Sequence, residues 1–151
     1  MSQATHLFVA TASRRPMREV EDVMAVADRG FQGCRYSRPG SRRQVLLVES
    51  ETLESLGLAP GQVKENVTTR GARLNDLASG ERLGIGQAVL EVTGPCGPCS
   101  RMDEIRMGLQ QELRGQRGIL CRVIQGGRIR RGDAVQVAWA AVAAPKIGGE
   151  L

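Results

Sequence analysis

Short apolar runs, separated by clusters of glycine, proline and charged residues, are the main pattern along the chain. Four of these runs have the length and the β-branched or aliphatic composition of strands, namely residues 7–12, 44–48, 119–124 and 134–139. Residues 63–69 are more polar but rich in β-branched types, so we predict a strand there that ends in a loop. Residues 23–27 are also apolar, but such a short run does not distinguish a strand from a helix.

Two segments have the patterns of helices instead. Residues 50–56 form a short helical pattern that ends at Gly57, a residue type that commonly follows a helix. Across residues 102–113, apolar side chains recur at helical spacing, namely Met102, Ile105, Leu109 and Leu113. We therefore predict one continuous helix over residues 102–113, with its methionine packed in the core.

Two further stretches lack a simple period. Residues 28–43 form a long connection of the kind that is usually either a functional loop or a disordered one. Residues 74–92 contain short strand-like pieces interrupted by Gly80, Gly84 and Gly86, a spacing that suits a tightly curved sheet.

Many short strands, few helices and regular turns predict a mainly β, single-domain fold. We expect a closed or nearly closed β-barrel with a few short helices. The barrel domain should span residues 5–139, and the Ala- and Gly-rich residues 140–151 should form a flexible tail.

The charge of the chain comes almost entirely from arginine. The 151 residues carry a formal net charge of +5, with 21 Lys and Arg against 16 Asp and Glu, and the lysines are Lys64 and Lys146. A genome rich in GC codons would produce this bias without any function. Guanidinium groups also bind phosphate and carboxylate in a bidentate manner, so a few of them could belong to an anion site.

Neither nucleic acid nor a membrane is favoured as a partner. The arginines are scattered along the chain, and the aromatic residues that could stack on bases are few: Phe8, Phe31, Tyr36 and Trp139. No apolar run is long enough to span a bilayer. Four cysteines do not make a disulfide scaffold in a chain of this size, and the start does not resemble a signal peptide, so we expect a cytoplasmic setting.

The loop at residues 94–101 is the strongest candidate for chemistry. It contains two glycines and two prolines around Cys96 and Cys99, so it displays two thiols on a stiff connection after a strand. A thiolate is a good nucleophile and a soft metal ligand. The C-x-x-C spacing alone also fits half of a zinc site or a redox pair.

A structural zinc site would need four ligands, commonly from two such pairs. The chain has no second pair: Cys34 and Cys121 stand alone, and His6 is the single histidine. Cys121 lies in an apolar run and is expected in the core. A zinc-binding interaction module built from the four cysteines stays open as an alternative from a different class.

Several segments together resemble a known family. In order they are Gly33-Cys34-Arg35-Tyr36, Arg43-Gln44-Val45-Leu46-Leu47-Val48, Glu65-Asn66-Val67-Thr68-Thr69-Arg70-Gly71, Gly80-Glu81-Arg82-Leu83-Gly84-Ile85-Gly86 and Val92-Thr93-Gly94-Pro95-Cys96-Gly97-Pro98-Cys99. The chain resembles a stand-alone, bacterial-type MOSC domain, named after the C-terminal part of molybdenum cofactor sulfurases. The resemblance implies a barrel of the pyruvate kinase insert type that binds the molybdenum cofactor.

The resemblance also implies a role for one cysteine, which matches Cys99 by position. In the family this cysteine either coordinates molybdenum, as in reductases of N-hydroxylated compounds, or carries sulfur as a persulfide for cofactor sulfuration. The predicted helix that follows and Arg101 would both favour a thiolate at Cys99. Cys96 is then an accessory residue: a resolving thiol, a second ligand or a bystander.

Other residues of the resembling segments are candidates for binding the cofactor. Asn66, Thr68 and Thr69 can hydrogen-bond a pterin edge or a phosphate ester, although the same types are ordinary in strands and turns. The candidates for anionic groups are Arg35, Arg42, Arg43, Arg70 and Arg101. Many relatives carry an acid where this chain has Cys34, which places a role for a carboxylate there in doubt and adds a third thiol.

A molybdenum-dependent oxidoreductase or a sulfur transferase would need a partner. The chain shows no flavin, haem or nicotinamide motif, so a reductase would need an electron donor on a separate chain, and a sulfur carrier would need a cysteine desulfurase. Pyridoxal phosphate, which serves the sulfurases, is not expected on this chain, because neither lysine has a suitable setting.

Overall fold

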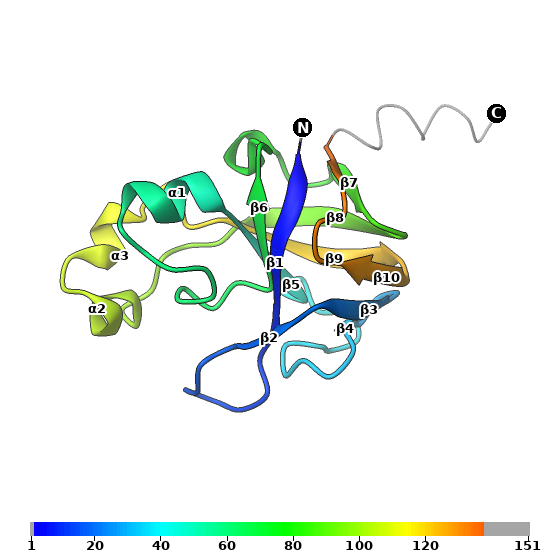
Figure 1. Ribbon diagram of the computed structural model, residues 1–151, viewed down its shortest axis with the longest axis horizontal. Helices are drawn as coiled ribbons and strands as arrows, with labels where there is room; N and C mark the ends of the chain where they lie inside the picture. The colour runs from blue at the N-terminus through cyan, green and yellow to red at the C-terminus, as the bar shows by residue number, and fades with distance from the viewer. Residues whose placement is uncertain (1, 138–151) are drawn as a thin grey trace.

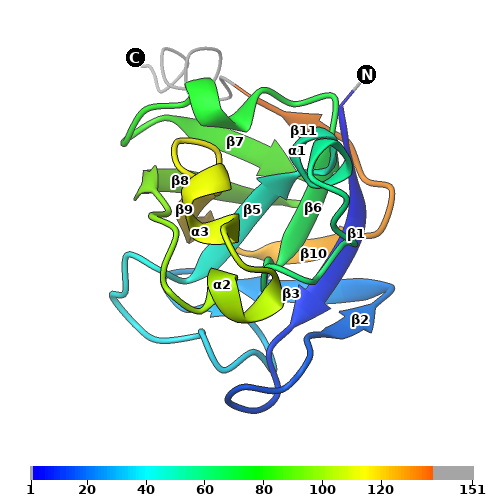
Figure 2. The same ribbon diagram turned by 90° about the vertical axis from the view of Figure 1, so that its left-hand side faces the viewer.

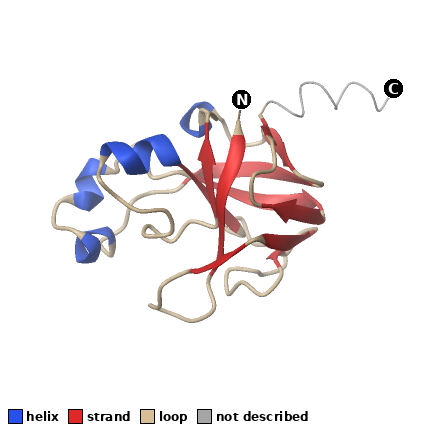
Figure 3. Cartoon of the chain, in the orientation of Figure 1, coloured by secondary structure: helices blue, strands red, loops and turns tan. Residues whose placement is uncertain are grey.

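The computed structural model describes residues 2–137 and is built mainly from strands. The strands are β1 (Gln3–Val9), β2 (Arg18–Val20), β3 (Asp22–Val26), β4 (Gly30–Phe31), β5 (Val45–Glu49), β6 (Val67–Arg70), β7 (Arg82–Ile85), β8 (Ala88–Pro95), β9 (Ile119–Gln125), β10 (Gly127–Arg130) and β11 (Val135–Gln136). The helices are α1 (Ser50–Ser55), α2 (Met102–Ile105) and α3 (Leu109–Glu112), with one 3-10 turn, η1 (Leu74–Asp76). Helices α1, α2 and α3 gather on one side of the strands (Figure 1, Figure 3).

The strands form two sheets. The larger has eight strands in the order β11-β7-β8-β9-β5-β6-β1-β2, and the smaller has three in the order β10-β3-β4. Only β5 and β6 pair in parallel, and α1 with the long connection after it joins them. The prediction of a mainly β, single-domain fold with a few short helices is confirmed.

The prediction of a closed or nearly closed barrel is only partly supported, because the sheet does not close. The eight-stranded sheet ends at β11 on one side and at β2 on the other, so no ladder of strand pairs closes it. The segment before β11 lies beside the start of β1 instead. An isolated bridge joins Gln3 and Ala134 there, and the backbone N–H of Ala4 donates to the carbonyl of Asp133 at 2.8 Å. Because β11 is only two residues long, it offers too little backbone for a full ladder.

Strand β5 is buried on both faces, and this explains its unbroken apolar sequence. Val45 and Leu47 face one core cluster, which lies within the curved sheets. Leu46 and Val48 face a second cluster with residues of α1, α2 and α3. Figure 2 looks onto the helices, which lie over β5. A strand covered on both sides has no polar face, so alternation is absent.

The predicted helix over residues 102–113 is broken into two turns, α2 and α3. Between them Arg106 is extended (φ −159°, ψ 131°) and Gly108 is left-handed (φ 90°), a conformation that glycine adopts without strain. The apolar positions Met102, Leu109 and Leu113 are nevertheless buried as predicted. The spacing therefore predicted which side chains face the core, but it did not predict the break.

Asn66 holds β5, β1 and the loop after β4 together. Its Oδ1 accepts a hydrogen bond from the N–H of Leu46 at 2.9 Å, and its Nδ2 donates to the carbonyl of Phe8 at 3.2 Å. Nδ2 also lies 3.4 Å from the sulfur of Cys34. The side chain is fully buried. The side-chain amide of Asn66 therefore makes its hydrogen bonds to other parts of the protein.

The C-terminal residues lie partly outside the description. The predicted tail, residues 140–151, and the last two residues of the predicted strand 134–139 belong to the part that the structure does not describe. Within residues 2–137, no helix combines the length and the hydrophobicity needed to cross a bilayer.

Replacing Asn66 by alanine should lower the free energy of unfolding by about 2–4 kcal/mol, because it leaves a buried N–H and a buried carbonyl without partners. Urea denaturation followed by circular dichroism measures this. Asn75→Ala, at an exposed side chain in η1, is the control and should change stability by less than about 0.5 kcal/mol. Equal stability of the two variants would contradict a structural role for Asn66.

Candidate functional site

One large cavity, of about 800 Å³, opens beside the cysteine loop. It is lined by the β1–β2 loop, the loop before β5, the residue Lys64, the cysteine loop with α2, and the turn before β9. The lining residues that carry polar, charged or sulfur groups are Ser13, Arg14, Arg15, Met17, Arg35, Tyr36, Arg38, Ser41, Arg43, Lys64, Cys96, Cys99, Arg101, Met102, Glu104 and Arg117. The long connection at residues 28–43 thus supplies one wall of the cavity.

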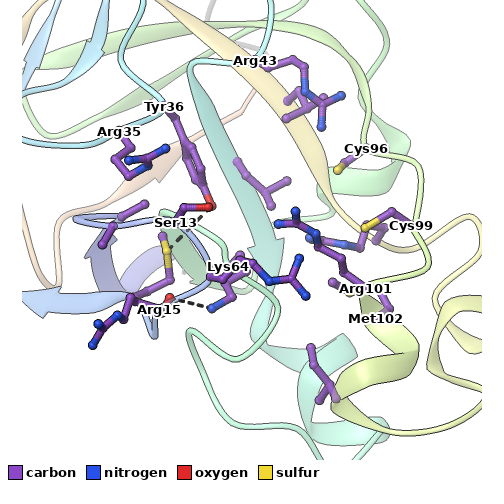
Figure 4. Close-up of a pocket in the computed structure, with 18 of the residues that line it drawn as sticks. Ser13, Arg15, Arg35, Tyr36, Arg43, Lys64, Cys96, Cys99, Arg101 and Met102 are labelled. Carbon is purple, nitrogen blue, oxygen red and sulfur yellow. Dashed lines mark hydrogen bonds between the residues drawn. The ribbon is translucent and has the colours of Figure 1, made fainter.

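The two thiols of the cysteine loop have different environments. Cys99 is exposed at the cavity, whereas Cys96 is only 7% exposed and packs into the core cluster beneath the helices. The backbone N–H of Cys96 donates to the carbonyl of Gly118 at 2.9 Å, which ties the loop to the start of β9. Figure 4 shows both cysteines on the side of the cavity opposite Tyr36 and Arg35. Cys99 is therefore the accessible thiol of the pair.

The helix expected to assist Cys99 is shorter than predicted. The carbonyl of Cys99 accepts from the N–H of Met102 at 2.9 Å, so Cys99 begins the turn that leads into α2. Because α2 spans only four residues, its dipole contributes little at the thiol. Arg101 lines the cavity. It follows Cys99 by two residues in the sequence and supplies positive charge that does not depend on the helix.

The other two cysteines are structural. The sulfur of Cys34 lies 3.4 Å from both the N–H of Ala10 and Nδ2 of Asn66, so the thiol accepts hydrogen bonds within the fold. Cys121 is fully buried, and burial raises the pKa of its thiol far above the usual range. Within residues 2–137, no three histidine, cysteine or acidic side chains converge to hold a metal.

Positive charge dominates the cavity. Its cationic lining residues are Arg14, Arg15, Arg35, Arg38, Arg43, Lys64, Arg101 and Arg117. Among the described lining residues, Glu104 is the single carboxylate, and it is 3.2 Å from the guanidinium of Arg14 in an exposed ion pair. The remaining cations therefore leave a strong positive potential for an anionic ligand.

Arg117 is the functional candidate that the sequence did not reveal. It is only 6% exposed, and one Nη donates to the carbonyl of Val63 at 2.6 Å. Its Nε and other Nη have no hydrogen-bond partner among the described residues. In the sequence this arginine stands between Gln116 and Gly118 and reads as part of a solvated turn. No local signal distinguished it from the exposed arginines around it.

Two residues of the lining have a strained backbone. Arg14 (φ 59°) and Lys64 (φ 71°) are left-handed, which is uncommon for residues other than glycine. Nζ of Lys64 donates to the carbonyl of Arg15 at 2.8 Å and so joins two walls of the cavity (Figure 4). Such conformations concentrate at functional sites, where the surrounding structure enforces them.

Buried Glu65 helps to enforce the conformation at Lys64. Its Oε2 accepts hydrogen bonds from the N–H of Gly61 at 2.8 Å and from the hydroxyl of Thr68 at 2.7 Å. The turn that carries Lys64 is therefore anchored to β6. Neither Glu65 nor Lys64 carries a local sequence signal for this arrangement.

Tyr36 contributes a protonated phenol to the cavity. Burial raises the pKa of Tyr36, and the neighbouring Cys34 acts in the same direction, while Arg117 and Arg101 oppose the shift. The hydroxyl hydrogen bonds weakly with the sulfur of Met17, at 3.9 Å. The phenol is thus a proton donor without a strong partner within the described residues.

The structure brings together only some of the residues singled out from the sequence. Cys99, Cys96, Arg35, Arg43 and Arg101 all line the cavity. The residues that do not line it are Cys34, Arg42, Asn66, Thr68, Thr69 and Arg70. Of these, Asn66, Thr68 and Thr69 are fully buried, and exposed Arg70 pairs with Glu54.

Solved structures of bacterial proteins share this fold. YuaD from Bacillus subtilis superposes with a TM-score of 0.73 at 21% identity, over 91% of this chain and 96% of that chain. YiiM from Geobacillus stearothermophilus gives a TM-score of 0.73 at 22% identity, over 95% of this chain and 78% of that chain. YiiM from Escherichia coli gives 0.67 at 18% identity, over 91% and 69%.

The sequence comparisons agree with the fold. No curated protein matches the sequence at a significant level. The family model of the MOSC domain matches residues 38–136, which include both β5 and the whole cysteine loop. The chain belongs to the MOSC domain family.

Proposed function

We propose that this protein binds the molybdenum cofactor in the cationic cavity, with the thiolate of Cys99 as a molybdenum ligand. The observation that carries the proposal is a single exposed thiol on a large cavity whose charged lining residues are cationic apart from Glu104. The MOSC domain family is associated with proteins of the molybdenum cofactor, and this chain matches the family over its cysteine loop.

The residues present fit such a cofactor. A cavity of about 800 Å³ lies within the range of sites for small molecules and cofactors. Thiolate is a soft ligand suited to a heavy metal, and Cys99 is the exposed thiol of the cavity. Arg35, Arg43 and Arg101 supply guanidinium groups for the anionic parts of the cofactor.

The chemistry that the bound cofactor supplies is redox chemistry at the metal, which suits the reduction of N-hydroxylated compounds. The chain itself fixes the metal through Cys99 and binds anionic groups through its arginines. Burial raises the pKa of Tyr36, and its Oη holds a proton that can be donated in a hydrogen bond to a bound ligand. Electrons would come from a donor on a separate chain.

A second candidate function follows from the exposure of Cys99. An exposed thiolate can attack the persulfide of a cysteine desulfurase, so that the terminal sulfur moves to Cys99 and the desulfurase regains its thiolate. Attack by the thiol of Cys96, which lines the same cavity, on the inner sulfur of a Cys99 persulfide would release hydrogen sulfide and leave a Cys96–Cys99 disulfide, which an external thiol reductant would have to reduce. A sulfur carrier alone does not need a large cationic cavity, so we rank this function second.

Four free cysteines suit a reducing compartment, and we propose a cytoplasmic location. The zinc alternative loses support, because the four cysteines and His6, all among the described residues, do not converge.

Replacing Cys99 by serine should remove molybdenum from protein purified from a host that makes the cofactor. A hydroxyl is a poor substitute for a thiolate, so the loss should at least equal the roughly tenfold effect typical of removing an outer-shell partner. Metal analysis and the fluorescence of the oxidised pterin measure this. The matched control is Cys96→Ala, which should keep the metal.

Two results would contradict the proposal. One is a Cys99→Ser variant that retains the molybdenum of the unaltered protein. The other is stoichiometric zinc in the unaltered protein without molybdenum or pterin. A sulfane-sulfur assay after incubation with a cysteine desulfurase and cysteine tests the second candidate on the same variants.

Alkylation of the native protein should modify Cys99 first, because it alone among the four cysteines is exposed. Brief treatment with iodoacetamide and peptide mass spectrometry measure the order of labelling. Cys34, Cys96 and Cys121 should react only after denaturation. Equal labelling of Cys96 and Cys99 in the native protein would contradict the difference in solvent exposure between the two thiols.

A further inference from the structure

We propose that Arg117 is the centre of an oxyanion subsite in the cavity, distinct from the thiol of Cys99, and that this subsite takes a phosphate monoester group. The subsite itself is inferred from the buried guanidinium of Arg117. Only the identification of the ligand that carries the phosphate rests on the proposed function.

The first observation is a buried cation without a counter-charge. Arg117 is 6% exposed, and its one protein hydrogen bond goes to a neutral carbonyl, that of Val63. No carboxylate among the described residues forms an ion pair with it, and Nε and one Nη have no acceptor. A buried charge left in this state is strongly unfavourable. An anion that reaches the guanidinium would remove that penalty.

The second observation is the geometry of the guanidinium. Nε and a terminal nitrogen of an arginine form a planar fork that matches two oxygens of a carboxylate or a phosphate. The hydrogen bond to Val63 occupies one Nη and holds the side chain in place. Nε and the other Nη are buried and have no acceptor, so each has a hydrogen left to donate to an oxygen of a bound anion.

The third observation is the neighbourhood. Arg117 and Arg101 both act to lower the pKa of Tyr36, against the larger effect of burial, so both positive charges lie near the same phenol. The hydroxyl of Tyr36 has only a weak contact to a sulfur, at 3.9 Å, and can donate to a ligand oxygen. A phosphate has a third and a fourth oxygen for such donors, which a carboxylate lacks. The excess of cations also favours a dianion.

The position of Arg117 also connects the subsite to the thiol loop. Gly118, the next residue, is left-handed (φ 125°), and an added Cβ would collide with the carbonyl of Leu47 in β5. This close approach places Arg117 against β5. The carbonyl of Gly118 accepts from the N–H of Cys96, so the thiol loop and Arg117 are fixed to one backbone segment.

The test compares phosphate binding by three proteins purified as full chains from a host that lacks the molybdenum cofactor. They are the unaltered protein, Arg117→Met and the control Arg114→Met, which removes the same charge at an exposed position outside the cavity. The probe is inorganic phosphate, compared with acetate and chloride at constant ionic strength. Thermal unfolding and titration calorimetry are the readouts.

Phosphate should raise the melting temperature of the unaltered protein and of Arg114→Met more than acetate does. Arg117→Met should lose this response, with phosphate affinity at least about tenfold weaker, the size expected for hydrogen bonds to a charged group. Without phosphate, the melting temperature of Arg117→Met does not separate the two roles, because the variant loses a buried charge but also leaves the carbonyl of Val63 without its donor. A merely structural arginine would leave the phosphate response unchanged.

Arg117→Lys is a second variant for the case that methionine prevents folding. It keeps the charge but loses the planar fork, so its phosphate affinity should also fall. The proposal is overturned if the unaltered protein shows no specific response to phosphate, or if both Arg117 variants bind phosphate as tightly as it does.

A second measurement, the pterin content of the variants, identifies the source of the phosphate group. If the group belongs to the cofactor, Arg117→Met from a cofactor-producing host should contain less pterin than Arg114→Met. If it belongs to a substrate, the pterin content of the two variants should be equal, and phosphate should still bind to the loaded protein. Phosphate binding that persists in Cys99→Ser would support the subsite even where the molybdenum proposal fails.

Discussion

Strand β5 is covered on both faces, and the position of the candidate site depends on this. One face packs into the core of the curved sheets and the other packs under the three helices. The cavity lies at the end of this helix-covered face, where Leu46 of β5 and Leu120 of β9 form part of its wall. Loops from the sheets and loops from the helical side therefore meet at this cavity. The fold thus brings the thiol loop, the loop before β5 and the β1–β2 loop together without a second domain.

The loops carry the reactive groups, but buried polar contacts behind them set their positions. Asn66 links β5 to β1, and Glu65 fixes the turn that carries Lys64. Both residues belong to the segment that first suggested cofactor contacts. Their side chains are fully buried and do not line the cavity. A segment that distinguishes a family can therefore act through the shape of a site without touching a ligand.

The sequence predicted those features that depend on local pattern or on the resemblance. Apolar runs located β5 and β9, because strands that are buried in a sheet need continuous or alternating apolar residues. The glycines and prolines around Cys99 correctly indicated an open loop. The closed barrel and the continuous helix were not correct. The first depends on whether distant edges meet, and the second on a break at Arg106 and Gly108 that the apolar spacing does not reveal.

Arg117 shows most clearly why part of the site could not be predicted. Its burial arises from the close approach of Gly118 to β5 and from the carbonyl of Val63, more than fifty residues away in the chain. Exposed cations such as Arg14 are screened by water and salt, so they attract an anion without holding it firmly. A buried guanidinium acts in a lower dielectric, where the same charge is worth much more. The exposed arginines and Arg117 therefore have different tasks. The first group raises the local concentration of an anionic ligand. Arg117, joined through Gly118 to the loop of Cys96 and Cys99, would fix the ligand relative to the thiol.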